Sequence, residues 1–267
     1  MDENNSYKNN QNEFVLDCSN ISKLFGGLVA LDNVSFSISK GIIVGVVGPN
    51  GAGKTTLFDV ISGVSNLSSG RILFEGMDIS KLSADKISSL GLQRTFQIPT
   101  AFNDMTVEEN IIVGATFAGK SRILSTKNSI SDHVKEIISL CKLEEHKNFQ
   151  AGVLAILQKK LLMVATALAG MPKLLMLDEP LGGLNKDERN QMLEFLYKIK
   201  NSGINLMIIE HVMSAMLNFV DQLVLLNHGK IIFTGTPEQA VNNEEVISIY
   251  LGNEAKLLKK RNYASKS

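Results

Sequence analysis

Residues 48–55 read Gly-Pro-Asn-Gly-Ala-Gly-Lys-Thr and match the pattern G-x-x-x-x-G-K-[ST] at every defined position. The run before them, residues 42–47, is continuously apolar and rich in β-branched side chains, which is typical of a strand buried on both faces. The residues after them, 54–62, are expected to form a helix that Gly63 ends. A strand, a glycine turn and a helix in this order predict an α/β fold with a phosphate-binding loop.

The residue types in this loop suit the binding of phosphate. Glycines allow successive backbone N–H groups to turn toward one anion, and the N-terminus of the following helix adds a partial positive charge. Lys54 is placed to reach the β- and γ-phosphates of a nucleotide, and Thr55 is placed to coordinate Mg²⁺. The alternative is a turn that only closes a strand–helix unit, which the Lys-Thr pair at the correct spacing disfavours.

A second motif, Leu-Leu-Met-Leu-Asp-Glu at residues 174–179, ends an apolar run in an acidic pair. In parallel sheets, ligands bind beyond the carboxyl ends of the strands. Asp178 in such a place can hold Mg²⁺ through water, and Glu179 can orient a water for attack on a γ-phosphate. The pair could instead begin a turn, since Pro180 stops the strand. Beside a phosphate loop, the functional interpretation is favoured.

Composition excludes several other classes of protein. The 267 residues are 44% apolar and 20% charged, which permits a large core and excludes wholesale disorder. The 27 basic and 27 acidic residues cancel, so no net positive field favours nucleic acid as a partner. Cys18 and Cys141 are too few for a disulfide framework. The polar start predicts no signal peptide, and Lys159 and Lys160 interrupt the longest apolar stretch, so no transmembrane segment is expected.

The pattern of apolar residues divides the chain into regions. Short β-rich pieces in residues 13–39, separated by Gly26-Gly27, predict antiparallel sheet. Helical periodicity takes over from about residue 101 to 160 and predicts a separate helical lobe, after which strands and helices alternate again. Residues 224–233 predict a hairpin. The polar residues 1–12 are expected to be a disordered tail and the basic residues 255–267 a solvated one.

These motifs, with the sequence around them, resemble the ATP-binding subunit of ABC transporters from about residue 14 to residue 252. Residues 23–38 resemble the opening strands of the family, where an aromatic side chain, here Phe25, stacks on adenine. Residues 90–97 (LGLQRTFQ) carry the glutamine of the family's Q-loop at Gln97, and residues 208–213 (IIEHVM) carry its switch histidine at His211. Residues 182–185 lie where the family has its D-loop.

Within this family, the strongest resemblance is to the importers of branched-chain amino acids. It rests on RTFQ followed by AFNDMTVEENI, on GGLN after the acidic pair, on EHVM, and on the ending GTPEQAVNNEEVISIYLG. ATPases of lipopolysaccharide export and of urea import share much of this sequence.

The resemblance implies a P-loop NTPase core of the ABC ATPase type, with an antiparallel β subdomain and a helical subdomain, over residues 13–254. It implies ATP and Mg²⁺ as cofactors, with Glu179, His211 and Gln97 as catalytic residues and Thr55, Gln97 and Asp178 around the metal ion. The residues it assigns to the nucleotide are Phe25, Gly48, Pro49, Asn50, Gly51, Ala52, Gly53, Lys54, Thr55 and Thr56. The implied partners are a second ABC ATPase subunit, two transmembrane permease subunits and, indirectly, a solute-binding protein, at the cytoplasmic face of the cell membrane.

The family's signature motif, LSGGQ or LSYGQ, is degenerate in this chain. Its place falls on Leu154-Ala155-Ile156-Leu157-Gln158, where only the first and last residues match. Ala155 lacks the hydroxyl that contacts the γ-phosphate, and Leu157 is expected to obstruct the approach of the backbone to phosphate. Because the family places each ATP between one subunit's loop and the other's signature, we expect a heterodimer whose second ATPase subunit has an intact signature. The alternative is a nucleotide-binding regulatory subunit with little hydrolysis of its own.

Several of these residues also have purely structural interpretations. Asn185 with Glu188 fits a capping box at the start of a helix, and Phe25 could be a core residue. His133, His146 and His228 match no motif and are expected at the surface. Cys18 and Cys141 share no metal-ligand spacing and are expected to be buried or incidental.

Overall fold

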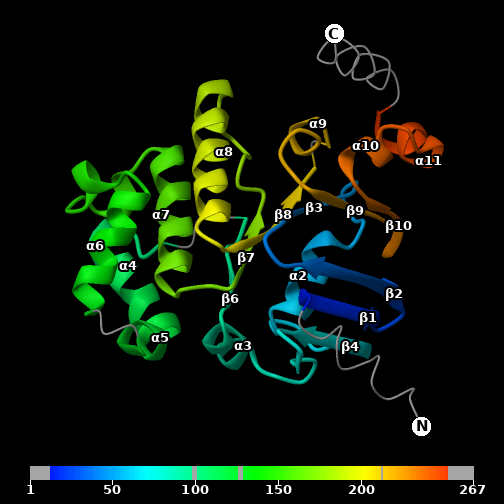
Figure 1. The fold of residues 1–267 in the computed structure, drawn as a ribbon, viewed down its shortest axis with the longest axis horizontal. Helices are drawn as coiled ribbons and strands as arrows, with labels where there is room; N and C mark the ends of the chain where they lie inside the picture. The colour runs from blue at the N-terminus through cyan, green and yellow to red at the C-terminus, as the bar shows by residue number, and fades with distance from the viewer. Residues whose placement is uncertain (1–12, 98–100, 126–128, 212, 252–267) are drawn as a thin grey trace.

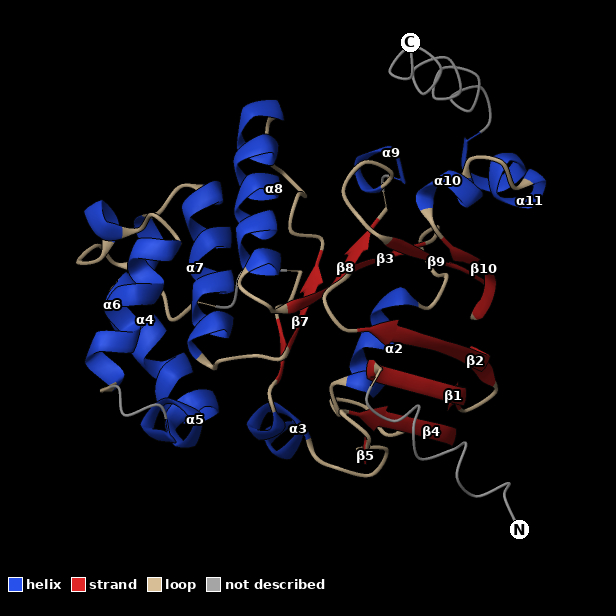
Figure 2. Ribbon diagram, viewed as in Figure 1, coloured by secondary structure: helices blue, strands red, loops and turns tan. Residues whose placement is uncertain are grey.

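The computed structural model describes residues 13–97, 101–125, 129–211 and 213–251. The expected terminal tails, 1–12 and 255–267, lie outside these residues. Within the described part of the chain, every helix is too short or too polar to cross a bilayer. The structure has two sheets and a group of helices arranged around them (Figures 1 and 2).

The central sheet has six strands in the order β10-β9-β3-β8-β7-β6. Neighbouring strands are parallel, except that β9 and β10 form the predicted antiparallel hairpin. β3, β7 and β8 are buried along their whole length, in keeping with their continuous apolar runs. The strands are β3 (Ile43–Val47), β6 (Leu92–Arg94), β7 (Leu174–Asp178), β8 (Asn205–Glu210), β9 (Gln222–Asn227) and β10 (Lys230–Gly235).

A second, antiparallel sheet has the order β2-β1-β4-β5, as the β-rich opening of the chain predicts. Its strands are β1 (Phe14–Phe25), β2 (Leu28–Ser39), β4 (Ser69–Phe74) and β5 (Met77–Asp78). Helix α2 (Lys54–Ile61) lies between the two sheets (Figure 1). Its Leu57 and Phe58 share one hydrophobic core with β1, with β2 and with Val44 and Val46 of the central sheet.

The opposite face of the central sheet is covered by helices. Ile43 and Val47 of β3 and Leu175 and Leu177 of β7 pack into a second core with these helices. Because successive side chains of a strand point to opposite faces, each of these buried strands serves both cores. The helices that flank this core are α4 (Val107–Gly114), α5 (Lys120–Ser125), α6 (Ile130–Leu140), α7 (Ile156–Ala169) and α8 (Lys186–Asn201).

The helical region (α4–α7) forms one end of the molecule (Figure 1). α4 begins with a capping box between Thr106 and Glu109, and it approaches α7 so closely that a Cβ on Gly114 would lie 2.1 Å from the backbone oxygen of Thr166. The predicted limit of the lobe at residue 160 falls inside α7, which continues to Ala169. The expectation for His133 was wrong, because its ring is buried in α6 with Nε2 3.2 Å from the backbone oxygen of Ala169.

The remaining elements are short. The helices are α3 (Ala84–Leu90), α9 (Met213–Met216), α10 (Pro237–Ala240) and α11 (Glu244–Val246), with π-helical turns at Ala115–Gly119 and Ile247–Leu251 and 3₁₀ turns at Glu144–His146 and Ala151–Val153. Cys18 in β1 and Cys141 at the C-cap of α6 are both buried and reduced.

Candidate nucleotide-binding site

The phosphate loop connects β3 to α2, as the sequence predicts. Its glycines are required by close approach of the neighbouring backbone: a Cβ on Gly48 would lie 2.6 Å from the oxygen of Leu226, and one on Gly53 would lie 2.7 Å from the oxygen of Ala30. Gly53 also has a φ of +103°, which side chains rarely adopt. The loop is therefore fixed between β2 and the β9–β10 hairpin, with the N-terminus of α2 behind it.

Lys54 occupies the floor of this loop and is only 7% exposed. Its Nζ donates hydrogen bonds to the carbonyl oxygens of Gly48 at 2.7 Å and Pro49 at 3.1 Å. Burial lowers the pKa of Lys54, while the carboxylates of Glu179 and Asp178 act in the opposite direction. An ammonium has three N–H donors, so these two bonds leave one for a phosphate oxygen.

A cleft of about 630 Å³ opens in front of the loop. Of the predicted residues, it is lined by Phe25, Asn50, Gly51, Ala52, Gly53, Lys54, Thr55, Thr56, Gln97 and Glu179. The Phe25 side chain is 49% exposed at this cleft, with the ammonium of Lys23 4.6 Å from its ring centroid, so it is not a core residue. His228 lines the cleft too, although no motif pointed to it. The cleft is thus lined by an exposed aromatic ring as well as by the phosphate loop and Glu179.

The acidic end of β7 is held by Arg94, a residue to which no sequence motif assigns a role. Asp178 is 3% exposed, and burial raises its pKa while the guanidinium of Arg94 opposes that rise. Arg94 contacts two carboxylates, with Nη1 2.6 Å from Asp59 and Nη2 3.5 Å from Asp178. Its guanidinium connects the end of β7 to α2 directly behind the loop.

Gln97, Glu179 and His211, the three residues expected to act in hydrolysis, meet beside the cleft. The amide of Gln97 donates to Glu179 Oε2 at 2.9 Å, and Nδ1 of His211 lies 3.6 Å from Glu179 Oε1. Glu179 has a φ of +49°. A non-glycine residue in this left-handed region is strained by about 1–3 kcal/mol, and such strain is concentrated at functional sites.

The oxygen groups here are those that Mg²⁺ prefers: the hydroxyl of Thr55, the amide of Gln97 and the carboxylate of Asp178. Thr55 and Gln97 line the cleft, whereas Asp178 is buried behind it and suits contact through water. The residues present therefore fit the ion. When bound, Mg²⁺ offsets negative charge on the β- and γ-phosphates.

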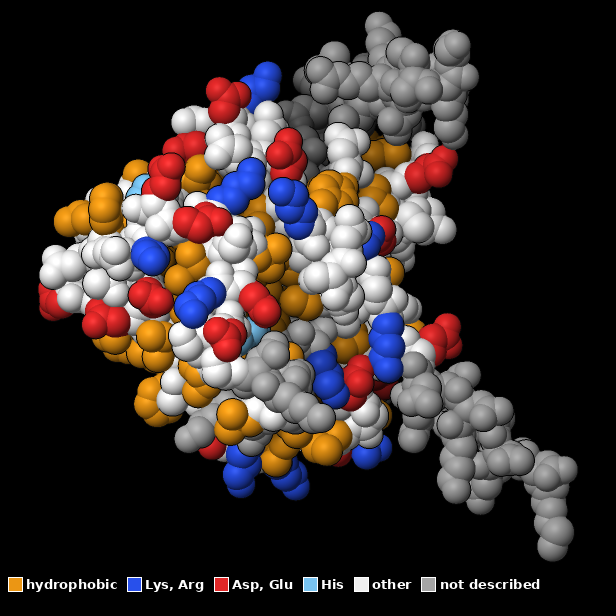
Figure 3. Space-filling view, turned by 60° about the vertical axis from the view of Figure 1, so that its left-hand side comes forward, with side chains coloured by type: hydrophobic (Ala, Val, Ile, Leu, Met, Phe, Trp, Pro, Cys, Tyr) orange, Lys and Arg blue, Asp and Glu red, His pale blue; other side chains and the backbone are white. Residues whose placement is uncertain are grey.

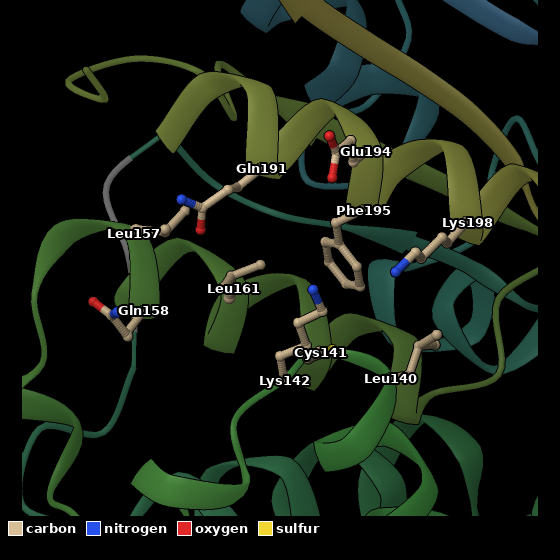
Figure 4. Close-up of a pocket in the computed structure, with 10 residues that line it drawn as sticks. All are labelled: Leu140, Cys141, Lys142, Leu157, Gln158, Leu161, Gln191, Glu194, Phe195 and Lys198. Atoms are coloured by element: carbon tan, nitrogen blue, oxygen red, sulfur yellow. The ribbon is translucent and has the colours of Figure 1, made fainter. Parts of the chain in front are cut away.

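The signature segment begins α7, and one expectation about it was wrong. Leu157 is only 6% exposed, and its side chain points toward α8 into a cavity that Leu161 and Phe195 also line (Figure 4). It therefore presents no obstacle to an approaching phosphate. The exposed apolar side chain is Ile156, at 44%, which lies against Gly183 of the D-loop segment. Ala155 is exposed at the N-cap of α7 and supplies no side-chain capping bond.

The D-loop segment ends in the capping box that its sequence predicts. The side chain of Asn185 accepts hydrogen bonds from the N–H groups of Asp187 and Glu188, and Glu188 accepts one from the N–H of Asn185. The capping box starts α8 just after Gly183, the residue that Ile156 contacts. The capping role of Asn185 is therefore present whether or not the segment also has the family role.

Comparison with known protein families identifies the chain. The profile of the ABC transporter family matches residues 31–182. The chain belongs to the ABC transporter family. A second profile, that of the branched-chain amino acid ATP-binding cassette transporter, matches residues 230–256. ABC transporter ATP-binding proteins are ATPases coupled to transport, so the chain is an ABC-type ATPase, and the resemblance stated from its motifs is confirmed.

Curated relatives cover nearly the whole chain. It is 36% identical over 245 residues to the probable branched-chain amino acid transport ATP-binding protein LivG of Archaeoglobus fulgidus, which spans 89% of this chain and 95% of the relative. It is 34% identical over 249 residues to the high-affinity LivG of Escherichia coli K12, spanning 89% and 98%.

Solved structures confirm the fold class. The chain matches a nucleotide-free ATP-binding cassette from an ABC transporter with a TM-score of 0.81 and 32% identity, over 90% of this chain and all of that one (100%). It matches the ADP conformation of an ATP-binding cassette with a TM-score of 0.79 and 33% identity, over 90% and 99%. The P-loop core with an antiparallel sheet and a helical region is thus the ABC ATPase fold.

Proposed function

We propose that this subunit hydrolyses ATP to energise the import of branched-chain or related amino acids. The observation that carries the proposal is the meeting of Gln97, Glu179 and His211 beside the cleft that holds the phosphate loop. The substrate class is supported by the names of the relatives and by the C-terminal profile. Transport specificity itself resides in other subunits of such an importer.

Each residue has a role that its position supports. Phe25 stacks on the adenine, and residues 48–56 bind the phosphates with Lys54 between the β- and γ-groups. Thr55, Gln97 and Asp178 hold Mg²⁺, the last through water. Glu179 orients the attacking water and accepts its proton, and His211, 3.6 Å from that carboxylate, contacts the γ-phosphate.

The proposed membrane partners are two permease subunits, at the cytoplasmic face of the membrane. A groove of about 170 Å³ runs between the end of β6 and the helical region, and Phe96 and Phe102, 43% and 55% exposed, line it. Gln97 follows directly in sequence, so a segment docked there would act on the glutamine in the cleft. Figure 3 shows exposed hydrophobic side chains at several places on the face that carries the helical region.

The second ATPase subunit is proposed to be a different chain with an intact signature. Ala155 supports this pairing, because it leaves the N-terminus of α7 without a hydroxyl where the family presents one to the partner's nucleotide. The same feature favours the second candidate, a regulatory subunit that binds nucleotide but hydrolyses little. The complete Gln97–Glu179–His211 cluster supports hydrolysis in the site that this chain builds.

The variant Glu179→Gln tests the proposed function. It keeps the hydrogen bond with Gln97 available but removes the group that accepts the proton from water. We expect ATP binding to be retained and phosphate release by the assembled transporter to fall by about 10²- to 10⁴-fold, the usual contribution of a general base. Retention of the wild-type rate would contradict the role of Glu179 in hydrolysis.

A further inference from the structure

Lys160 is a buried lysine in the second turn of α7. It is only 4% exposed, and its Nζ donates a 2.8 Å hydrogen bond to the backbone oxygen of Glu179. Burial lowers the pKa of Lys160, and the carboxylates of Glu210, Glu179 and Asp178 act against this shift. Removing an ammonium from water is costly, so a buried lysine is retained where a specific partner holds it. Here that partner is the main chain of the acidic residue beside the cleft.

The backbone of Glu179 is held at both of its ends. Its N–H donates to the oxygen of Ile209 at 3.0 Å, and its carbonyl oxygen accepts from the N–H of Gly182 at 3.2 Å as well as from Lys160. Glu210, 2% exposed, accepts from the N–H of Leu181 at 2.9 Å and fixes the turn that follows. A left-handed conformation at Glu179 persists only because such surroundings over-determine it.

We propose that Lys160 is a positioning residue for Glu179, and that it ties the start of α7 to the direction in which the Glu179 side chain leaves the backbone. This inference rests on the proposed role of Glu179 in hydrolysis. Lys160 does not line the nucleotide cleft, so it acts through the Glu179 carbonyl and not on the nucleotide. α7 begins at Ile156, next to the exposed Ala155. A displacement of this helix end is therefore transmitted to Glu179 by one side chain.

The neighbouring lysine provides a matched control. Lys159 also lies in α7 and donates through Nζ to a backbone oxygen, that of Gly152 at 2.9 Å, in an exposed hydrogen bond that does not involve Glu179. Lys160→Met removes the donor and the charge but keeps an unbranched side chain that is one atom shorter, and Lys160→Arg keeps the donor and the charge. Lys159→Met makes the same substitution at an exposed hydrogen bond elsewhere on the same helix.

Two measurements separate positioning from general stabilisation. In the full-length chain alone, hydrogen exchange of the backbone amides at residues 179–182 should become faster in Lys160→Met, while exchange in β3 and β8 stays as in the wild type. In the assembled transporter, kcat should fall by about 10²-fold with KM for ATP unchanged, since a small misplacement of a catalytic group costs this much. Lys160→Arg should recover most of the rate, and Lys159→Met should behave as the wild type.

The outcomes that overturn the inference are also specific. A wild-type kcat in Lys160→Met would show that Glu179 does not depend on this bond. Faster exchange throughout the chain, with kcat and ATP affinity lost together, would show that Lys160 only stabilises the fold. If Lys160→Met does not fold, Lys160→Gln is measured with the same criteria. A wild-type transporter without ATPase activity would contradict the proposed function instead, while exchange at residues 179–182 would still test the hold on Glu179.

Discussion

Arg94 shows how much of this site is decided by one side chain. Its side chain is 5% exposed and contacts two carboxylates, that of Asp59 in α2 and that of Asp178 in β7. Its ring neighbours are Phe58 and Phe96, with the guanidinium carbon 5.5 Å and 5.0 Å from their centroids. Its partners Asp59 and Asp178 lie 35 and 84 residues away in sequence, so no local sequence pattern predicts these contacts. The motifs could predict Asp178 but not the cation that holds it.

Arg94→Met is expected to destabilise the chain by about 3 kcal/mol, because removing one member of a buried ion pair leaves a carboxylate uncompensated. Urea unfolding measures the change. The matched control is Arg71→Met, whose pair with Asp78 is exposed on both sides, so that its loss should cost less than about 1 kcal/mol. Equal effects of the two substitutions would contradict the account of Arg94.

The loss of stability in Arg94→Met should depend on pH. Burial already raises the pKa of Asp178 above its ordinary 3.8, and loss of Arg94 removes the charge that opposes the rise. A group with a raised pKa in the folded state favours folding below its ordinary pKa and loses this contribution as pH rises through the folded value. The free energy of unfolding that Arg94→Met loses, compared with the loss in Arg71→Met, should therefore grow with rising pH above 3.8. A loss that shrinks over this range would be inconsistent with an uncompensated Asp178.

At the scale of elements, the sequence predicted those that coincide with a continuous apolar run or adjoin a contiguous motif. β3, β7 and the β9–β10 hairpin lie where the apolar runs place them, α2 follows the phosphate loop, and α8 starts at the expected capping box. β6, by contrast, has three residues, too few for a pattern of alternation, and its pairing with β7 is what makes it a strand. The direction of Leu157 was mispredicted because the motif says which residue type is absent but not which face of α7 is buried.

The start of α7 carries the prediction that belongs to this scale. Ala155→Ser restores a hydroxyl at the N-cap, while Leu157 is left in place because truncating a buried leucine costs about 2–5 kcal/mol. If the missing hydroxyl limits the ATP site between this signature segment and the phosphate loop of the second subunit, the ATPase rate of the assembled transporter should rise. One preorganised donor is worth about 10²- to 10³-fold in a site that is otherwise competent.

Val153→Ser is the control for this substitution. It adds the same hydroxyl to an exposed residue just before the segment and should leave the rate unchanged. A wild-type rate in Ala155→Ser would mean that the missing hydroxyl at residue 155 does not limit hydrolysis.

At the scale of the whole molecule, the two sheets and the helical region place the phosphate loop and Glu179 at the end of β7 on one cleft, and the signature segment at the start of α7. The fold class and the residues around the phosphate loop could be predicted, because a short contiguous motif encodes them. Contacts such as Arg94 with Asp178 and Lys160 with Glu179 could not, because they join distant segments. Whether this chain can close over a second nucleotide by itself decides between a symmetric pair and the proposed heterodimer.

The most direct measurement is the solution mass of full-length Glu179→Gln with and without Mg²⁺-free ATP, together with the amount of nucleotide bound. Blocking hydrolysis stabilises any ATP-dependent dimer that the chain can form. We predict that the protein binds ATP and stays monomeric, because the segment from Leu154 to Gln158 lacks the hydroxyl that a symmetric pair would need. An ATP-dependent dimer of this chain alone would contradict the heterodimer, and failure to bind ATP would contradict the site itself.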